Sequence, residues 1–238
     1  MSKRILVVGG CPRSGTTALV RLLNSHPDIL LGDERYYWPF DEGRVSEALF
    51  ERDRFLDLRE EDRHWREGRA PFPPGDTGAA YDRARIVGDK YPPLARAAEA
   101  IDRALPRAEI VWIVRNPLSV AESYEARRRD GDDAWHFGAE RALADWNDSV
   151  RAACMAGGRV LIVTYERLFA SGAGAARLFE ALGLDPEPAR DGATRVLGEA
   201  GTLRTREGQR CEDLRFLVAR GADWASYATL AEERCLLA

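Results

Sequence analysis

The chain has 238 residues, of which 45% are hydrophobic and 31% charged, and its formal net charge is −4. This length suits one α/β domain of ordinary size, and the composition excludes a disordered chain. A mildly acidic protein has no general attraction for nucleic acid, so an anion site must gather its arginines and backbone N–H groups in one place. We therefore expect no nucleic-acid partner.

The cysteines and the apolar segments indicate the compartment. The four cysteines lie far apart and form no C-x-x-C pair, which favours neither a zinc site nor a disulfide framework. The first residues run directly into the apolar stretch 5–8, which is too short for an export signal. No stretch approaches the ~18 apolar residues that span a membrane. The sequence predicts a soluble, cytoplasmic protein without a bound metal.

The chain opens with the pattern of a strand, a glycine-bearing loop and a helix. Ile5–Val8 is a short apolar run that stops at Gly9-Gly10, as a buried strand does on entering a loop. From Thr17 apolar residues recur at helical spacing, and His26-Pro27 ends that helix. A second apolar segment covers 29–31. This order is the opening of a parallel α/β sheet.

Residues 41–85 differ in character from the rest. They are rich in charge at 59–63 and in turn-forming residues at 71–75. We expect one or two surface helices and a mobile loop here, inserted over the end of the sheet instead of forming a separate domain. Such an insertion would shape a binding site.

The remaining chain alternates apolar strands with helices. Strands are predicted at 86–88, 109–114 and 160–163, and helices at 94–105, 118–129, 137–155 and 173–182. Gly183 would cap the last of these helices. After Gly192 we expect a polar, arginine-rich loop and then a helix over about 211–220. The pattern predicts a single three-layer α/β/α domain, residues 1–238, with a central parallel sheet.

The loop after the first strand has the spacing of a nucleotide-binding P-loop. Four residues separate Gly10 from Gly15, and a helix follows. At this position unpaired backbone N–H groups and the positive helix end would hold a phosphate. Thr16 stands where a lysine normally follows the second glycine, and a cation occurs earlier, at Arg13. The alternative is that the two glycines merely form a tight turn.

The sequence provides little to hold magnesium. The best central strands end at Asp89, Arg115 and Thr164, so only the first offers a carboxylate. Without the lysine and a magnesium-holding pair, γ-phosphoryl transfer loses its main charge stabilisers. The fold expected is that of P-loop nucleoside triphosphate hydrolases, but the loop suits an anion that needs no metal.

Four segments resemble motifs of the sulfotransferases that use 3′-phosphoadenylyl sulfate (PAPS). Residues 10–17 resemble their 5′-phosphosulfate loop, and residues 113–117 with Ser123 look like their 3′-phosphate motif. Residues 163–168 are similar to their Y-E-D-L segment, and residues 179–184 to the helix end that follows it. The matches come in family order and cover roughly residues 4 to 185.

The resemblance implies a nucleotide held at both of its ends. Arg13 would contact the phosphosulfate near its bridging oxygen, and the loop would add amide and hydroxyl donors from Ser14, Gly15, Thr16 and Thr17. Arg115 and Ser123 would bind the 3′-phosphate. Independently of the family, Arg115 ends a buried strand, at the sheet edge where α/β proteins bind ligands, and its planar fork suits a phosphate. A surface salt bridge is the alternative for Arg115, and a plain helix-surface role for Ser123.

Tyr165 matches the family tyrosine that lies against adenine, with core packing as the alternative. Further along, the residues at 204–210 have the basic, glycine-bearing composition of the family's loop over the 3′-phosphate, although their sequence departs from its usual form. We therefore name the segment 201–210 without assigning its contacts.

The acceptor hydroxyl needs a base. Glutamate serves after the second strand in the carbohydrate-modifying members of the family, and here Glu34 follows that strand, with Asp33 as the substitute if the register slips by one. An ordinary exposed acid is the alternative. Lys90 resembles the lysine of a family K-x-P segment and would steady the sulfonate oxygens or the acceptor; a structural pair with Asp89 is the alternative.

The predicted function is sulfuryl transfer from PAPS to a hydroxyl of a small-molecule or carbohydrate acceptor, without a metal. The resemblance is closer to the glutamate-base, carbohydrate-type and bacterial members than to those with a histidine base. A P-loop kinase or other NTPase is the second hypothesis, and a non-catalytic nucleotide-binding module the third. The sequence identifies neither the acceptor nor the oligomeric state.

Overall fold

The computed structural model describes residues 3–63, 70–130, 135–206 and 212–237, apart from the side chains of 201–206 and 212. Five strands form one sheet in the order β2-β3-β1-β4-β5, and every neighbouring pair is parallel. The strands are β1 (Arg4–Gly10), β2 (Ile29–Asp33), β3 (Ile86–Pro93), β4 (Glu109–Val114) and β5 (Val160–Thr164). The predicted parallel sheet is confirmed.

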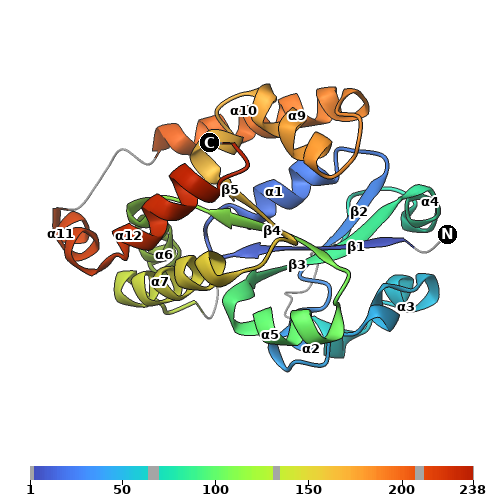
Figure 1. Ribbon diagram of the computed structural model, residues 1–238, viewed down its shortest axis with the longest axis horizontal. Helices are drawn as coiled ribbons and strands as arrows, with labels where there is room; N and C mark the ends of the chain where they lie inside the picture. Colours follow the sequence, from blue (N-terminus) through green and yellow to red (C-terminus); the bar gives the residue numbers. More distant parts are fainter. Residues whose placement is uncertain (1–2, 64–69, 131–134, 207–211, 238) are drawn as a thin grey trace.

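Helices cover both faces of the sheet, so the predicted three-layer α/β/α, P-loop-like fold is also confirmed (Figure 1). One layer contains α1 (Thr16–Leu23), α9 (Gly172–Ala181) and α10 (Arg190–Arg206). The other contains α5 (Leu94–Ala104), α6 (Pro117–Asp130) and α7 (Ala139–Met155). Because strand side chains alternate, Leu6 and Val8 enter the core under the first layer, and Val7 the core under the second.

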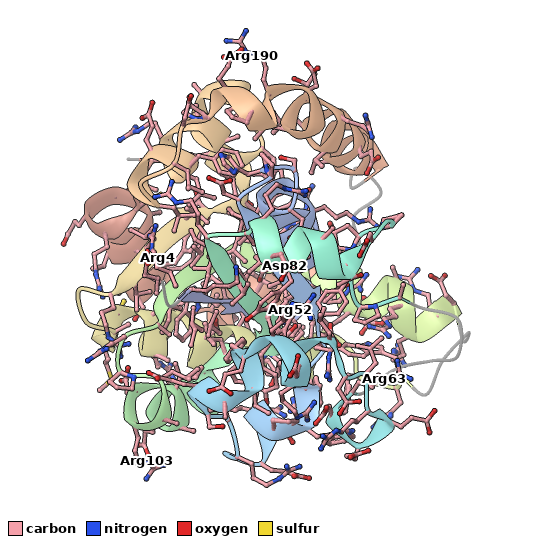
Figure 2. All side chains as sticks on the ribbon, turned by 90° about the vertical axis from the view of Figure 1, so that its right-hand side faces the viewer. Arg4, Arg52, Arg63, Asp82, Arg103 and Arg190 are labelled. Carbon is pink, nitrogen blue, oxygen red and sulfur yellow. The ribbon has the colours of Figure 1, made fainter. Side chains whose placement is uncertain are left out.

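The described part of the segment between β2 and β3 consists of short helical turns, of which α2 lies beside α5 (Figure 1). They are α2 (Tyr37–Asp41), η1 (Glu47–Phe50), α3 (Arg52–Leu56), η2 (Glu60–Asp62) and α4 (Thr77–Arg83). An exposed ion pair joins α3 to α4, where Arg52 Nε lies 2.6 Å from Asp82 Oδ1 (Figure 2). The helical content expected between 41 and 85 is therefore present, in shorter pieces than a surface helix usually has.

The prediction of a loop after Gly192 is wrong. The backbone continues as α10 to Arg206, because Ala193, Val196, Leu197 and Ala200 recur at helical spacing and pack on the core beneath α1. The high arginine content of the segment masked this apolar stripe.

The chain ends in further helical turns beyond β5. They are α8 (Tyr165–Leu168), η3 (Glu187–Ala189), α11 (Glu212–Gly221), α12 (Trp224–Ala228) and η4 (Thr229–Arg234). α11 agrees with the helix predicted at 211–220. No helix in the described part of the chain is long and apolar enough to cross a membrane.

Candidate functional site

The glycine loop joins β1 to α1 at the carboxyl edge of the sheet. Its turn is closed by Ser14 N–H, which donates to Cys11 O at 3.1 Å, and the Ser14 side chain is fully buried. α1 begins at Thr16, so the N–H groups of its first turn have no partner within the helix. Gly15 and the first residues of α1, Thr16 and Thr17, therefore remain as the backbone donors for an anion.

Gly15 cannot be replaced by a larger residue without strain. Its φ is 94°, in the left-handed region, and a Cβ at this position would overlap the Tyr165 ring. Tyr165 itself is buried and packs on Phe169, with ring centroids 4.8 Å apart. The tyrosine expected beside adenine thus lies under the loop.

Arg13 links the loop to the next strand and helix. Its Nε donates to Ser123 Oγ at 3.0 Å, and its carbonyl oxygen accepts from Arg115 Nη1 at 3.2 Å. The residue is more than a third exposed overall, but protein atoms remove part of the water around its guanidinium, and Arg127 and Arg115 lie nearby. These effects, in that order, lower the Arg13 pKa, although the guanidinium remains charged. The two predicted phosphate motifs therefore meet at this residue.

Arg115 is held from two sides at the end of β4. Its guanidinium carbon lies 4.2 Å from the centre of the Tyr165 ring, and its carbonyl oxygen accepts from Trp146 Nε1 at 2.8 Å. The side chain is almost entirely buried. A buried, stacked guanidinium keeps a fixed orientation, which argues against the surface salt bridge considered from the sequence.

Lys90 gathers the acidic residues that follow β2. Its ammonium lies 2.9 Å from Glu34 Oε1, donates to Thr17 Oγ1 at 2.8 Å and also contacts Asp33 Oδ1. Lys90 is only 1% exposed, although it carries a charge. Its partners are therefore Asp33 and Glu34, and not Asp89, the partner considered as the alternative.

Asp89 instead faces the backbone of the turn after Glu34. Its two carboxylate oxygens accept from Arg35 N at 3.0 Å and from Tyr36 N at 2.6 Å. Burial raises the Asp89 pKa to about 7, although N–H groups of Tyr36, Arg35 and Lys90 and the Arg35 charge partly oppose this. The sequence marked Asp89 only as a carboxylate at a strand end; its contacts with Arg35 N and Tyr36 N were missed, because these groups lie more than fifty residues earlier.

The aromatic residues after Glu34 separate into two environments. Tyr36 is fully buried, and its hydroxyl donates to Leu49 O in the segment between β2 and β3. Tyr37 and Trp38 are half-buried and pack edge to face, with ring centroids 5.1 Å apart. Only Tyr37 and Trp38 are therefore exposed enough to meet a ligand.

A buried ion pair, also missed from the sequence, ties this turn to the η2 segment. The Arg35 guanidinium is fully buried, and its Nη1 lies 2.8 Å from Asp62 Oδ2. Asp62 also accepts from Arg54 Nη2 at 2.6 Å. Asp62 belongs to the charge-rich stretch 59–63, whose composition is typical of a solvated surface, so nothing local marked it as buried.

Two further observations bound the site. Part of the predicted 201–210 segment belongs to α10, while its side chains and residues 207–210 lie outside the described residues. Within the described ranges, no group of three or more His, Cys, Asp or Glu residues is arranged to hold a metal ion.

The sequence profile of the sulfotransferase family matches residues 6–188, a range that includes Arg13, Glu34, Lys90, Arg115, Ser123 and Tyr165. The chain belongs to the sulfotransferase family. No curated protein matches this sulfotransferase in sequence.

Solved structures of other sulfotransferases share its fold. The sulfotransferase domain of the curacin biosynthetic pathway is 18% identical, with a TM-score of 0.52 over 79% of this chain and 76% of that one. The domain from the Synechococcus PCC 7002 olefin synthase is 23% identical, with a TM-score of 0.51 over 77% and 74%. The sulfotransferase STF9 from Mycobacterium avium is 16% identical, with a TM-score of 0.52 over 98% and 78%. At these identities the likeness concerns the fold alone.

Proposed function

We propose that this sulfotransferase uses PAPS as its donor and transfers the sulfuryl group to a hydroxyl or similar nucleophile of a small-molecule or carbohydrate acceptor. The observation that carries the proposal is the direct contact of Arg13 with both Ser123 and Arg115. These residues belong to two separate anion motifs, and their proximity fits a single nucleotide with a phosphate at each end.

The reaction requires charge stabilisation at the leaving group and removal of one proton. The acceptor oxygen forms a bond to sulfur, while the bond from sulfur to the bridging phosphate oxygen breaks. Arg13, Lys90 and the N–H groups at the start of α1 would stabilise the negative charge that develops on the leaving phosphate and the sulfuryl oxygens. Glu34 would take the acceptor proton.

Glu34 and Lys90 are suited to work as a pair. The buried Lys90 ammonium lies 2.9 Å from Glu34 Oε1, so it fixes the position of that carboxylate. The same ammonium donates to Thr17 Oγ1 at the start of α1, so the base and the anion loop share one cation. This arrangement supports Glu34, and Asp33 as its close neighbour, as the base.

We further propose that the segment between β2 and β3 shapes the acceptor site, as an insertion in a single domain. Its attachment supports this, because Asp62 in η2 holds Arg35, the residue that directly follows the proposed base. The half-buried Tyr37 and Trp38 come directly after Tyr36 in the chain, and their rings pack edge to face. Rings of this kind pack well against the apolar face of a sugar or a natural product.

Thermal shift with adenosine 3′,5′-bisphosphate, ADP and ATP tests the donor. A ligand held by the folded state raises Tm once its concentration exceeds Kd. We expect the bisphosphate to give the largest shift, without magnesium, and Arg115→Ala to abolish the preference over ADP. Arg103→Ala is the matched control, because Arg103 is an exposed arginine on α5 that projects from the edge of the molecule (Figure 2). An equal response to ADP, or a requirement for magnesium and ATP, would favour the kinase hypothesis.

A further inference from the structure

The turn that carries Glu34 is conformationally unfavourable. Glu34 has φ 62°, and Arg13 is the other non-glycine residue with positive φ in the described part of the chain. A side chain in this region costs about 1–2 kcal/mol relative to a right-handed conformation. Such a conformation persists only where neighbouring groups hold it. The groups that hold the turn therefore determine where the Glu34 carboxylate lies.

Asp89 holds the turn through its backbone. Its carboxylate receives the two N–H groups that directly follow Glu34, at 3.0 Å from Arg35 N and 2.6 Å from Tyr36 N. Asp89 is itself fixed in the sheet, because β3 is paired with β2 on one side and with β1 on the other. A carboxylate that accepts two N–H groups provides a rigid anchor for the backbone.

The opposing strand leaves room for this contact. Gly32 is the β2 partner of Asp89 in the sheet, and a Cβ on Gly32 would lie 2.6 Å from both Asp89 Oδ1 and Arg35 Cβ. A glycine is therefore required for the carboxylate to reach the turn. The next residues in register, Asp33 and Lys90, form an ion pair, and the same Lys90 ammonium contacts Glu34 Oε1.

These contacts assign a role to a residue that does not touch the reacting atoms. We propose that Asp89 is a positioning residue of the sulfuryl-transfer reaction: by accepting the Arg35 and Tyr36 N–H groups it keeps Glu34 in the left-handed turn, with its carboxylate against Lys90. The inference rests on the proposed function, because it treats Glu34 as the base.

Asp89→Asn tests this role with little change in shape. The asparagine oxygen accepts one of the two N–H groups, but its NH2 group faces the other N–H and cannot accept from it. We expect the Glu34 carboxylate to move out of contact with Lys90 in a crystal structure of the variant. An unchanged contact between Glu34 and Lys90 in that structure overturns the inference, whatever the acceptor is.

A kinetic readout distinguishes positioning from general stability. Hydrolysis of PAPS to adenosine 3′,5′-bisphosphate and sulfate uses water as the acceptor, so it needs no knowledge of the natural one. We expect Asp89→Asn to lower kcat by roughly 10-fold or more, a loss of rate that misplacement of a general base can cause. The KM for PAPS should change by less than about 2-fold. Bisphosphate binding, measured by thermal shift, should stay at the wild-type level.

A double-mutant cycle shows whether Asp89 acts through Glu34. If it does, Asp89→Asn has no further effect on kcat in a Glu34→Gln background, since the base is already absent. Glu109→Gln is the control: it removes a carboxylate that pairs with Arg4 at 2.7 Å, at the opposite end of the sheet, and should hydrolyse PAPS at the wild-type rate. Additive losses from Asp89→Asn and Glu34→Gln would overturn the inference.

Gly32→Ala provides a second variant if Asp89→Asn does not fold. It leaves the Asp89 charge in place but directs a methyl group at Oδ1, so the same loss in kcat with retained bisphosphate binding is expected. Failure of the proposed function gives a different result: the wild type then neither prefers the bisphosphate nor releases it from PAPS. If the wild type hydrolyses PAPS and both Asp89→Asn and Gly32→Ala hydrolyse it at the wild-type rate, the role of Asp89 is overturned while the proposed function stands.

Discussion

The Arg13 guanidinium donates from Nε to Ser123 Oγ at 3.0 Å, which joins the loop after β1 to the second turn of α6 across more than one hundred residues. The bond orients a cation that otherwise has several rotatable bonds. It also places a hydroxyl from the predicted 3′-phosphate motif beside the cation of the predicted phosphosulfate loop. Because the side chain is already oriented, binding of a nucleotide to both motifs would cost less conformational entropy.

Removal of the Ser123 hydroxyl should weaken bisphosphate binding. A hydrogen bond to a charged group contributes about 1.5–3 kcal/mol, so Ser123→Ala should raise Kd roughly 10-fold or more. Isothermal titration with adenosine 3′,5′-bisphosphate measures this. Ser171→Ala is the matched control, since Ser171 is an exposed serine before α9 that makes no capping bond. Equal affinities for Ser123→Ala and the control would show that Ser123 does not contribute to binding.

The left-handed turn at Glu34 makes a prediction for stability. Glycine adopts φ 62° freely, whereas alanine does not, so Glu34→Gly should be more stable than Glu34→Ala by about 1 kcal/mol. Both variants lack the carboxylate and should be equally inactive. Chemical denaturation of the two proteins compares them directly. If Glu34→Ala is at least as stable as Glu34→Gly, the turn leaves the left-handed conformation when the side chain is removed.

The close contact of Gly15 with Tyr165 predicts a coupled pair of substitutions. Gly15→Ala introduces a Cβ into the Tyr165 ring at a position with φ 94°, and overpacking of this kind costs about 1–3 kcal/mol. Tyr165→Leu should recover part of that loss in the double variant, because the ring is then absent. Denaturation of the two single variants and the double variant provides the cycle. Strict additivity would exclude the predicted overlap.

The buried ion pair of Arg35 with Asp62 should be essential for folding stability. Asp62→Ala leaves a fully buried guanidinium without its carboxylate, a change that typically costs about 3–5 kcal/mol. Asp53→Ala removes an exposed aspartate from α3, in the same segment, and should have little effect. Thermal or urea denaturation distinguishes the two. Similar stabilities for the two variants would show that water reaches Arg35.

Asp89 predicts a pH dependence of stability. Its pKa rises from 3.8 to about 7 on folding, chiefly through burial, while the facing N–H groups of Arg35, Tyr36 and Lys90 and the Arg35 charge oppose the rise. Between these values the folded state binds more protons than the unfolded state. The free energy of unfolding therefore falls as pH increases from about 4 to about 7, by up to about 1.4 kcal/mol per pH unit, and this contribution is constant at higher pH.

Urea denaturation of the wild type and of Asp89→Asn between about pH 4 and pH 8 tests this dependence. The difference in unfolding free energy between the two proteins should change with pH below about 7 and become constant above it. A difference that is independent of pH would show that Asp89 does not titrate in this interval.

Sequence patterns alone predicted the elements that carry the anion site. The apolar runs of β1, β4 and β5, and the helices that follow them, have periodicities that depend only on neighbouring residues. In a parallel sheet the strand ends share one edge, so residues after different strands, such as Arg13 and Arg115, are expected to meet there. The structure brings these two into contact.

Only the tertiary structure decided which buried polar groups face each other. Lys90 pairs with Asp33 and Glu34, Asp89 binds the backbone at 35 and 36, and Asp62 holds Arg35. A charged residue in a charge-rich stretch has the same local sequence whether it is solvated or buried. Its environment depends on partners that arrive from distant parts of the chain, so burial and pairing are properties of the packed fold and not of any short segment.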